Sequence, residues 1–305
     1  MRSQAEPTLI LDTTGGRCGK APARTPVPER LGRYELIHEI GKGAMGVVYR
    51  GRDPRINREV AIKAIPLADE FDPADLEQAR VRFFREAEMA GRLSHPHIVT
   101  IYDAGEDRGT AYIAMELLRG QHLVEYTGAA GLLPTAVGIE IVARLADALH
   151  YAHQNQVVHR DIKPANIMFD FDAPSGELKI TDFGIARLTD SGRTRTGVVL
   201  GTPSFMSPEQ LQGRPVTGRS DLFSLAVSLY QLLTGQLPFR GDSMPGLMMK
   251  IVQEPHPRIC AINPALPPAL DPFFDRALAK NPAERYDSGA IFAQALRDLN
   301  VPDKR

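Results

Sequence analysis

The densest group of reactive side chains in this sequence lies in the segment His159–Asn166. It contains a carboxylate at Asp161, an ammonium group at Lys163 and an amide at Asn166. Transfer of a phosphoryl group to a hydroxyl needs a carboxylate that orients the hydroxyl and accepts its proton, a cation on the moving group, and an oxygen ligand for Mg²⁺. The segment supplies one of each, so it indicates phosphoryl transfer. His159 is expected to pack rather than to catalyse, because Asp161 already fills the role of the base.

A second carboxylate follows in the tetrapeptide Thr181–Gly184, directly after the predicted strand Leu178–Ile180. A carboxylate at the end of a strand, next to a glycine, can point away from the sheet and bind Mg²⁺ through oxygen. Asp182 is therefore a second candidate metal ligand.

Glycines recur earlier in the chain in the pattern Gly41-x-Gly43-x-x-Gly46. Glycine lets a strand–turn–strand backbone approach a phosphate chain without clashes from Cβ, and the amides of such a turn can donate to phosphate. The pattern alone is weak evidence, since a chance hairpin or a dinucleotide-binding turn also carries it. Here a strand rather than a helix is expected to follow, which argues against the dinucleotide turn.

A lysine then stands in the apolar segment Val60–Lys63. Burial of a lysine is costly unless the charge is paired, so an acid on the following helix is expected as its partner, Glu86 or alternatively Glu88. At a few ångströms and an effective dielectric constant near 20, such a pair has a Coulomb energy of roughly 4 kcal/mol before desolvation. A lysine on a solvated strand face is the alternative interpretation of the isolated pattern.

The elements that must position these residues fall into two groups. From Tyr34 onward, short β-branched segments separated by turn residues predict strands at 34–41, 46–53, 59–67, 98–102 and 111–117, with a helix at 73–93. From Pro134 onward the pattern is mostly helical, interrupted by a strand–turn–strand at 167–169 and 178–181. Within the helical part, Leu222–Leu233 is expected to be a helix buried on all sides. The whole predicts a two-lobed α+β protein.

The bulk properties limit the possible partners and location. The 305 residues, 43% of them apolar, suffice for one large two-lobed unit, and the net charge of −1 without a basic tract argues against nucleic acid or an anionic membrane as main partner. No stretch reaches the ~18 apolar residues of a membrane span, and no secretory signal is recognisable, so a cytoplasmic location is expected. Cys18 and Cys260 lack metal or redox spacing and are expected to be free thiols. His95 and His97 are expected to be structural.

In order and spacing, these motifs resemble the eukaryotic-type protein kinases over roughly Tyr34 to Leu299, and in particular the bacterial branch of the Ser/Thr kinases. The resemblance implies an antiparallel-sheet N-lobe with one key helix at 32–116, a hinge at 116–120 and a mainly helical C-lobe at 120–300. Residues 1–31, rich in Pro, Gly, Thr and Arg, are expected to form a disordered tail, and 301–305 a second one. The implied activity is transfer of the γ-phosphoryl group of ATP, with Mg²⁺ or Mn²⁺, to Ser or Thr of protein substrates in signal transduction.

The same resemblance assigns roles to individual residues. Asp161 would be the catalytic base, Lys163 would contact the γ-phosphate, and Asn166 and Asp182 would bind the metal. Lys63 would hold the α- and β-phosphates and pair with Glu86. The other residues expected around ATP are Gly41, Lys42, Gly43, Ala44, Met45, Gly46, Val48, Ala61, the gatekeeper Met115, and Glu116 and Leu118 of the hinge.

Three further matches concern the scaffold and the subtype. Glu209 stands in Ser-Pro-Glu, where the family usually has Ala-Pro-Glu, and would pair with Arg285, while Asp221 would open the buried helix and brace the catalytic loop. Lys163 followed by proline, and Thr202 placed to approach Asp161, resemble Ser/Thr kinases. The residues Ala44-Met45 and the sequence Ser-Pro-Glu-Gln at 207–210 resemble the bacterial branch.

A polar loop between Asp182 and Glu209 carries Thr194 and Thr196. In the geometry of the family, three arginines would converge on one phosphothreonine there, namely Arg82, Arg160 and Arg187. A phosphate at that place could make one to three charge-assisted hydrogen bonds and order the loop. The hypothesis is activation by autophosphorylation at Thr194 or Thr196. The alternatives are an ordinary surface loop and a target site of another kinase.

Two other functions are alternatives to a protein kinase. A pseudokinase scaffold would lack one of Lys63, Asp161, Asn166 or Asp182, and all four are present. A small-molecule phosphotransferase would lack the Ser-Pro-Glu segment and its arginine partner. The resemblance also allows a homodimer through the N-lobe. Bacterial members of the family often continue into a membrane helix, so the resemblance implies that this chain could be the cytosolic part of a longer membrane-anchored protein.

Overall fold

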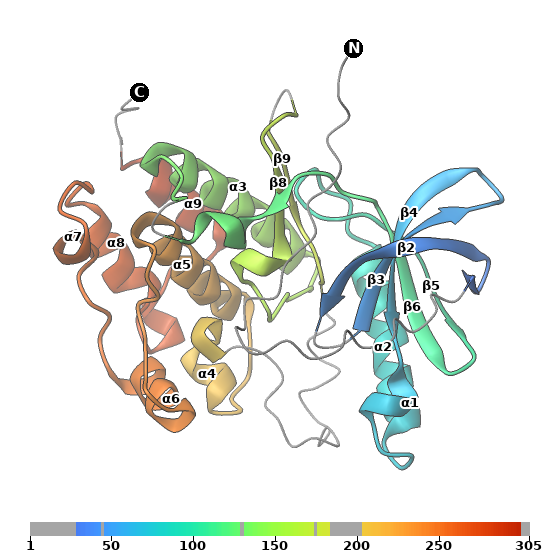
Figure 1. The fold of residues 1–305 in the computed structure, drawn as a ribbon. Helices are drawn as coiled ribbons and strands as arrows, with labels where there is room; N and C mark the ends of the chain where they lie inside the picture. Colours follow the sequence, from blue (N-terminus) through green and yellow to red (C-terminus); the bar gives the residue numbers. More distant parts are fainter. Residues whose placement is uncertain (1–28, 44–45, 129–130, 174–175, 184–202, 300–305) are drawn as a thin grey trace, which may run out of the picture.

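Two lobes lie side by side in the computed structural model, which describes residues 29–43, 46–128, 131–173, 176–183 and 203–299. In Figure 1 the sheet-rich lobe is at the right, the helical lobe at the left, and the small sheet with β8 and β9 lies between them. The prediction of a two-lobed α+β protein is confirmed.

The N-terminal lobe is built on a six-stranded antiparallel sheet with the strand order β1-β2-β3-β4-β6-β5. The strands are β1 (Arg30–Leu31), β2 (Tyr34–Gly43), β3 (Gly46–Asp53), β4 (Arg58–Ile65), β5 (Ile101–Asp107) and β6 (Thr110–Met115). Consecutive strands β2, β3 and β4 form the meander that the sequence predicted.

The start of the chain and the strand at 98–102 differ from their predictions. Arg30 and Leu31 pair with β2 as β1, so the folded part reaches into the predicted tail of residues 1–31, most of which lies outside the described residues. Strand β5 begins later than predicted because Ile98 bridges to Ile180 of the other lobe instead. The Val99 amide donates to the Ile180 carbonyl at 3.0 Å, which ties the two lobes together.

Each face of the six-stranded sheet has its own apolar core. One face packs against α1 (Leu67–Glu70) and α2 (Leu76–Gly91), whose buried positions Ala79, Phe83 and Ala87 recur every four residues, as on one stripe of a helix. The other face buries Tyr34, Val60, Ile62 and Tyr112, with Leu31 of β1 at its edge. Helix α2 thereby has its position fixed relative to β4.

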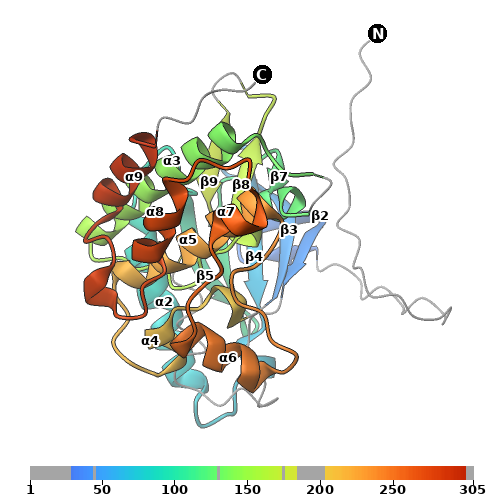
Figure 2. The ribbon, with the colours of Figure 1, turned by 90° about the vertical axis from the view of Figure 1, so that its left-hand side faces the viewer.

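The C-terminal lobe is helical and includes a small three-stranded sheet in the order β7-β8-β9. Its helices are α3 (Thr135–Gln154), α4 (Pro208–Leu211), α5 (Gly218–Thr234), α6 (Met244–Gln253), α7 (Ile259–Ile262), α8 (Leu270–Ala277) and α9 (Gly289–Arg297). Its strands are β7 (Gln121–His122), β8 (Ile167–Asp170) and β9 (Glu177–Ile180), and its 3₁₀ turns are η1 (Leu123–Tyr126), η2 (Pro164–Asn166), η4 (Pro203–Phe205) and η5 (Pro282–Glu284). In Figure 2, α3 and α9 lie together at one end of this lobe and α6 at the other.

Helix α5 is the centre of this lobe and is buried on nearly all sides, as predicted from its apolar sequence. Two of its hydroxyls donate to carbonyls one turn back in the helix: Ser228 Oγ to the Ser224 carbonyl at 2.9 Å, and Thr234 Oγ1 to the Tyr230 carbonyl at 2.7 Å. The helix ends at Gly235, whose φ of +69° suits glycine. A rigid α5 is the base on which the catalytic segment rests.

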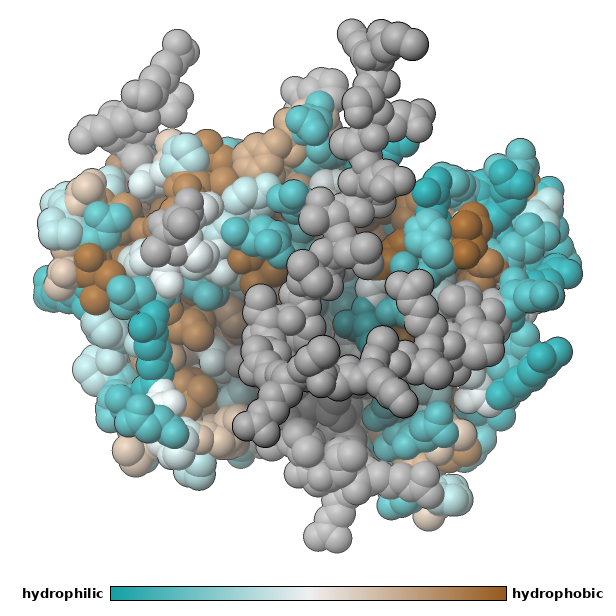
Figure 3. Space-filling view, viewed as in Figure 1, coloured by the Kyte–Doolittle hydropathy of each residue, from teal (hydrophilic) through white to brown (hydrophobic). Residues whose placement is uncertain are grey.

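Among the described residues no helix is both long and apolar enough to cross a bilayer. In Figure 3 hydrophilic side chains cover much of the sheet-rich lobe, and hydrophobic ones form separate patches over the helical lobe. Cys260 is a free thiol, as predicted, and Cys18 lies outside the described residues.

Candidate active site

The glycine pattern forms the tip of the β2–β3 hairpin. Gly41 pairs with Val48, and Gly43 pairs with Gly46. Gly46 has a φ of +147°, and a Cβ built on it would lie 2.0 Å from the Ala64 carbonyl oxygen of β4. Only glycine allows this close approach. Gly46 is thus held against the strand that carries Lys63, while Ala44 and Met45 lie outside the described residues.

Lys63 is brought to the site by β4, where it pairs in register with Val48 on one side and Ile113 on the other. The side chain is buried, and its Nζ lies 2.8 Å from Asp182 Oδ1. The ion pair that Lys63 forms in this structure is therefore with Asp182, and the predicted pairing with Glu86 or with Glu88 is wrong for this conformation. The physical requirement of a charged partner holds, and the carboxylate that follows β9 meets it.

The catalytic segment brings three of the predicted residues into direct contact. Lys163 Nζ donates to Asp161 Oδ2 at 2.7 Å, and Asn166 Nδ2 donates to the same oxygen at 2.9 Å. Asn166 Nδ2 also donates to the Asp161 carbonyl at 2.8 Å, which closes the turn η2. The Asn166 carbonyl accepts the Thr181 amide at 2.9 Å, so the segment is tied to the residue before Asp182. The candidate base Asp161 and the cation Lys163 therefore lie beside Asn166, and the segment is linked to the strand end that carries Asp182.

Two residues of this site adopt positive φ angles that are unusual outside glycine: Arg160 at +70° and Asp182 at +62°. Such conformations cost on the order of 1–3 kcal/mol and persist where the surroundings fix them. His159 supplies part of that support. It is fully buried, its Nε2 lies 2.7 Å from the Thr181 carbonyl, and its ring centroid is 4.5 Å from that of Phe183. The prediction that His159 packs rather than catalyses agrees with these contacts.

Asp221, in the first turn of α5, braces the catalytic segment from below. Its Oδ1 accepts the Arg160 amide at 2.7 Å, and its Oδ2 accepts the His159 amide at 2.9 Å. His153 of α3 lies 2.8 Å from Asp221 Oδ2 as well, a partner that sequence reasoning missed. Burial by itself raises the pKa of Asp221, but the contact with His153 and the amides outweighs it, so the pKa is lowered and the carboxylate stays ionised.

Asp182 is charged for a similar reason. Burial by itself raises the pKa of this carboxyl, and the charge and hydrogen bond of Lys63 lower it further than burial raises it. The net pKa lies below the ordinary value, so the group is a carboxylate at neutral pH, the form that binds a cation. Among the described residues, no group of three His, Cys, Asp or Glu side chains is placed to hold a metal by itself.

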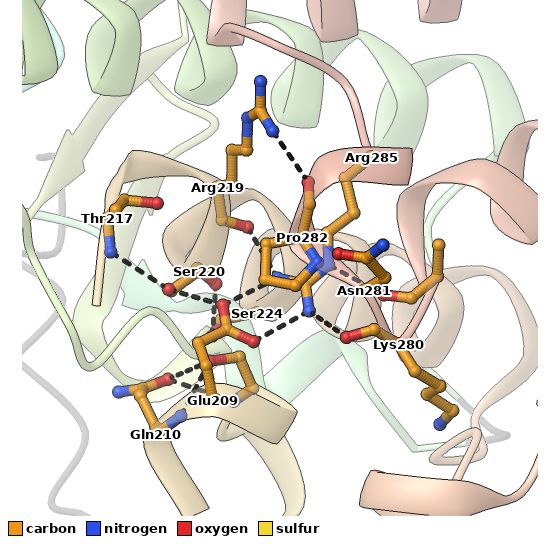
Figure 4. A network of polar contacts seen from close by, with 12 residues as sticks. Glu209, Gln210, Thr217, Arg219, Ser220, Ser224, Lys280, Asn281, Pro282 and Arg285 are labelled. Atoms are coloured by element: carbon orange, nitrogen blue, oxygen red, sulfur yellow. Dashed lines mark hydrogen bonds and ion pairs between the residues drawn. The ribbon is translucent and has the colours of Figure 1, made fainter. Parts of the chain in front are cut away.

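The buried ion pair between Glu209 and Arg285 forms as predicted (Figure 4). Arg285 Nη1 and Nη2 donate to the two Glu209 carboxylate oxygens at 2.7 and 2.8 Å, and both residues are at most 4% exposed. Ser220 Oγ donates to Glu209 at 2.6 Å, and Arg285 Nε donates to the Ala279 carbonyl at 2.7 Å. The pair joins α4, α5 and the segment after α8, and it serves as scaffold.

The predicted hinge connects β6 to β7. Met115 ends β6 opposite Ala61, which brings the two predicted nucleotide-site residues together. The Glu116 amide donates to the Thr100 carbonyl at 2.9 Å, and the Glu116 carboxylate accepts Lys179 Nζ of β9 at 3.0 Å. Lys179 was missed by sequence reasoning, because nothing local in the sequence joins β9 to the hinge. Leu118 follows in the irregular segment before β7.

His95 and His97 are structural, as predicted. The His97 amide donates to His95 Nδ1 at 3.1 Å, and Arg144 Nε of α3 donates to His97 Nε2 at 3.3 Å. The His95 ring stacks on Tyr151 of the same helix at 5.3 Å. Both imidazoles have pKa values lowered chiefly by burial, so they are neutral at pH 7 and join the two lobes.

The predicted phosphate pocket lies largely outside the part of the chain that the structure describes. Arg82 is on α2 and Arg160 is in the catalytic segment, but Arg187, Thr194, Thr196 and Thr202 are not among the described residues. Their convergence stays a prediction.

A hairpin glycine turn, a buried lysine and an Asp–Lys–Asn segment, placed between a sheet-rich and a helical lobe, define a protein kinase domain. The family model of the protein kinase domain matches residues 34–297 of this chain. The chain therefore belongs to the protein kinase domain family.

Named relatives are bacterial. The chain is 42% identical over 258 residues to the serine/threonine-protein kinase PrkC of Bacillus subtilis, covering 84% of this chain and 39% of the relative. It is 40% identical over 274 residues to the serine/threonine-protein kinase PknD of Mycobacterium tuberculosis, covering 89% and 40%. The chain thus spans about two fifths of the length of these relatives. The crystal structure of the Mycobacterium tuberculosis PknI kinase domain superposes with a TM-score of 0.72 at 32% identity, covering 88% of this chain and 97% of that one.

Proposed function

We propose that this chain is a serine/threonine protein kinase, which transfers the γ-phosphoryl group of metal-bound ATP to Ser or Thr hydroxyls of proteins. The observation that carries the proposal is the contact of Asp161 with both Lys163 and Asn166, beside an ionised Asp182 held by Lys63. The names of the bacterial relatives at 38–42% identity support the same activity.

Within this arrangement the Asp161 carboxylate would orient the substrate hydroxyl and accept its proton. Lys163 and Asn166 both donate to Oδ2, so the other oxygen, Oδ1, is the one that would approach the hydroxyl. Lys163 would place positive charge near the transferred group, where negative charge is spread over three oxygens. The protein supplies orientation and electrostatic stabilisation, and it forms no covalent bond to the phosphoryl group in this proposal.

The residues present fit a divalent cation bound together with ATP. Asn166 uses its amide nitrogen on Asp161, which leaves the amide oxygen as a ligand, and the ionised Asp182 supplies a carboxylate. Two protein oxygens are few, as expected for Mg²⁺, which commonly binds one or two carboxylates plus substrate phosphates. When bound, Mg²⁺ or Mn²⁺ would neutralise charge on the phosphates. Lys63, which lies 2.8 Å from Asp182, would then contact the phosphates as well.

Mass spectrometry after incubation with Mg-ATP, beside Asp161→Asn, tests the proposal. We expect phosphate on Ser or Thr of the chain or of an added protein, and a loss of about 10²–10⁴-fold in the variant, the usual contribution of a positioned base. Phosphorylation of small alcohols but not of proteins would favour a small-molecule phosphotransferase. ATP binding without any transfer would favour the pseudokinase.

Activation by autophosphorylation at Thr194 or Thr196 belongs to the same proposal. Arg82 and Arg160 would bind the phosphate together with Arg187 and order the loop through charge-assisted hydrogen bonds. Replacement of both threonines by alanine should remove the loop phosphate and slow transfer to an added substrate. Unchanged activity and unchanged loop phosphate would contradict this part.

A homodimer through the N-lobe is a further part of the proposal. Ile56, in the turn between β3 and β4, is 60% exposed, and beside that turn Arg33 bonds both Asp53 and Asp103. An exposed apolar side chain next to a charged cluster suits a small polar-rimmed contact. Sedimentation over a range of concentrations should show self-association that Ile56→Asp abolishes. A chain that stays monomeric at every concentration would rule the dimer out.

A cytoplasmic location of the chain stays a prediction from the sequence.

A further inference from the structure

Gln210, in the short helix α4, contacts the catalytic segment directly. Its Nε2 donates to the Arg160 carbonyl oxygen at 2.8 Å, although the two residues are 50 positions apart in the chain. On its other side Gln210 Oε1 accepts both the amide and the hydroxyl of Ser207, each at 3.0 Å. The side chain therefore bridges the start of α4 and the residue before Asp161.

The orientation of the Gln210 amide is fixed by its partners. A reversed amide would place two donors, the NH₂ group and the Ser207 amide, against each other, and it would place two acceptors against each other at Arg160. Only the observed orientation satisfies both ends. Ser207 is fully buried, so it cannot replace its lost partner with bulk water at little cost. Burial and donor–acceptor matching hold Gln210 in place.

Arg160 is a residue that needs such support. Its φ of +70° is unfavourable for a side chain of this type, and the same peptide stretch ends in the Asp161 carboxylate. Asp221 holds the Arg160 amide at 2.7 Å, and Gln210 holds the Arg160 carbonyl at 2.8 Å. The two contacts come from different helices and fix the peptide on both sides of Cα. The peptide that connects Arg160 to Asp161 is held at its amide by His159 Nδ1, at the longer distance of 3.2 Å, and Gln210 holds its carbonyl.

We propose that Gln210 is a positioning residue for phosphoryl transfer: its amide holds the Arg160 carbonyl so that the Asp161 carboxylate keeps the orientation needed to accept the hydroxyl proton. The inference rests on the proposed kinase activity. It also links two parts of the molecule, because Ser207, which orients Gln210, follows the 3₁₀ turn η4 after one residue, Met206. A shift of that segment would reach Asp161 through one side chain.

Gln210→Glu tests the inference with almost no change in shape. The carboxylate keeps an acceptor for Ser207 but replaces the donor to Arg160 with an oxygen that repels the carbonyl. Gln212→Glu is the matched control, because it makes the same change two residues later in the exposed C-cap position of α4. Gln210→Met, of similar size and without charge, is the second variant in case the first folds poorly.

Single-turnover rapid quench with the 305-residue chain in excess over ATP separates positioning from folding. With the folded molecules still in saturating excess, a variant that merely unfolds in part consumes the ATP with the normal rate constant, whereas mispositioning lowers the rate constant itself. We expect Gln210→Glu and Gln210→Met to lower the rate constant about 10- to 100-fold, the range for a misplacement near 1 Å. The KM for ATP should change little, since Gln210 lies behind the catalytic segment, and Gln212→Glu should match wild type.

The outcomes distinguish a failure of the positioning role of Gln210 from a failure of the proposed kinase activity. Rate constants within about twofold of wild type for both Gln210 variants, or an equal loss in Gln212→Glu, would overturn the positioning role. A wild-type chain that binds ATP and transfers nothing would overturn the proposed function itself and the inference with it.

Discussion

Replacement of Arg285 by methionine should destabilise the fold strongly, because it leaves the buried Glu209 carboxylate without its cationic partner. Arg285 is 1% exposed and Glu209 is 4% exposed, and the two are joined by contacts of 2.7 and 2.8 Å. In Figure 4 the guanidinium lies among backbone carbonyls and the Glu209 carboxylate, so the variant loses several partners at once. Methionine keeps much of the volume, and the loss is therefore mainly electrostatic.

Removal of one member of a buried pair typically costs about 3–5 kcal/mol, because the other charge stays desolvated. For a domain of this size that corresponds to a fall in Tm on the order of 10 °C. Ser220 Oγ still donates to Glu209 at 2.6 Å, but one neutral donor does not replace a bidentate guanidinium. The double variant Glu209→Gln/Arg285→Met removes the stranded charge and should recover at least about 1 kcal/mol relative to Arg285→Met.

Urea unfolding of wild type and both variants, followed by circular dichroism, measures these differences at several pH values. In wild type, burial raises the pKa of Glu209 but Arg285 and Ser220 lower it more, so the net pKa lies below its ordinary value. That contribution to stability is present above the ordinary glutamate pKa and is lost as pH falls through the lowered one. Without Arg285, burial raises the pKa, and protonation relieves the variant. The gap between wild type and Arg285→Met should therefore narrow from about pH 7 to about pH 5.

If Arg285→Met lowers the free energy of unfolding by less than about 1 kcal/mol, Glu209 must contact water or another partner in the variant. That result would refute the prediction that burial keeps the Glu209 carboxylate unpaired. A double variant no more stable than Arg285→Met would refute it independently, because the stranded carboxylate would then not be the cause. A gap that widens on acidification would contradict the assigned direction of the pKa change.

Three further predictions follow from the same contacts. Burial lowers the pKa of Lys280 to about 8, although its Nζ donates to the Ile251 carbonyl at 2.7 Å. Between about pH 8 and 10.5 this lysine therefore binds fewer protons in the folded state than in the unfolded state. Wild type should thus gain stability over Lys280→Met as pH rises through that window, and parallel thermal-melting profiles would disprove this. The pKa of His97 is lowered by burial and by Arg144, so wild type should lose stability relative to His97→Gln as pH falls below about 6.5. Urea titrations at several pH values would measure this loss. A stability difference that does not change with pH would contradict the prediction. Asp221→Asn should lower kcat and cost about 2 kcal/mol of unfolding free energy, because one charged acceptor of the catalytic segment is lost; steady-state kinetics and urea unfolding check this, and unaltered kcat would exclude the brace.

The local patterns were good guides to the secondary structure. Strand β3 spans Gly46–Asp53, the stretch that its β-branched residues and flanking turns predicted, and α5 is the all-round buried helix that its apolar sequence predicted. The strand expected at 98–102 began later, because backbone bonds to β9 took the place of pairing within the N-lobe. Propensity cannot show which neighbour a strand segment will have.

The sequence by itself determined which chemical groups the site contains. Asp161, Lys163 and Asn166 stand within six positions of the chain, so their contact needed only local geometry. The tertiary structure decided the partners of the site residues: Lys63 meets Asp182 instead of Glu86. It also decided that Gln210 reaches the Arg160 carbonyl and that His153 reaches Asp221 across 68 positions. The reason is physical: a buried charge or amide selects whichever complementary group the packing of distant elements brings within hydrogen-bond distance, and no local pattern in the chain encodes that choice.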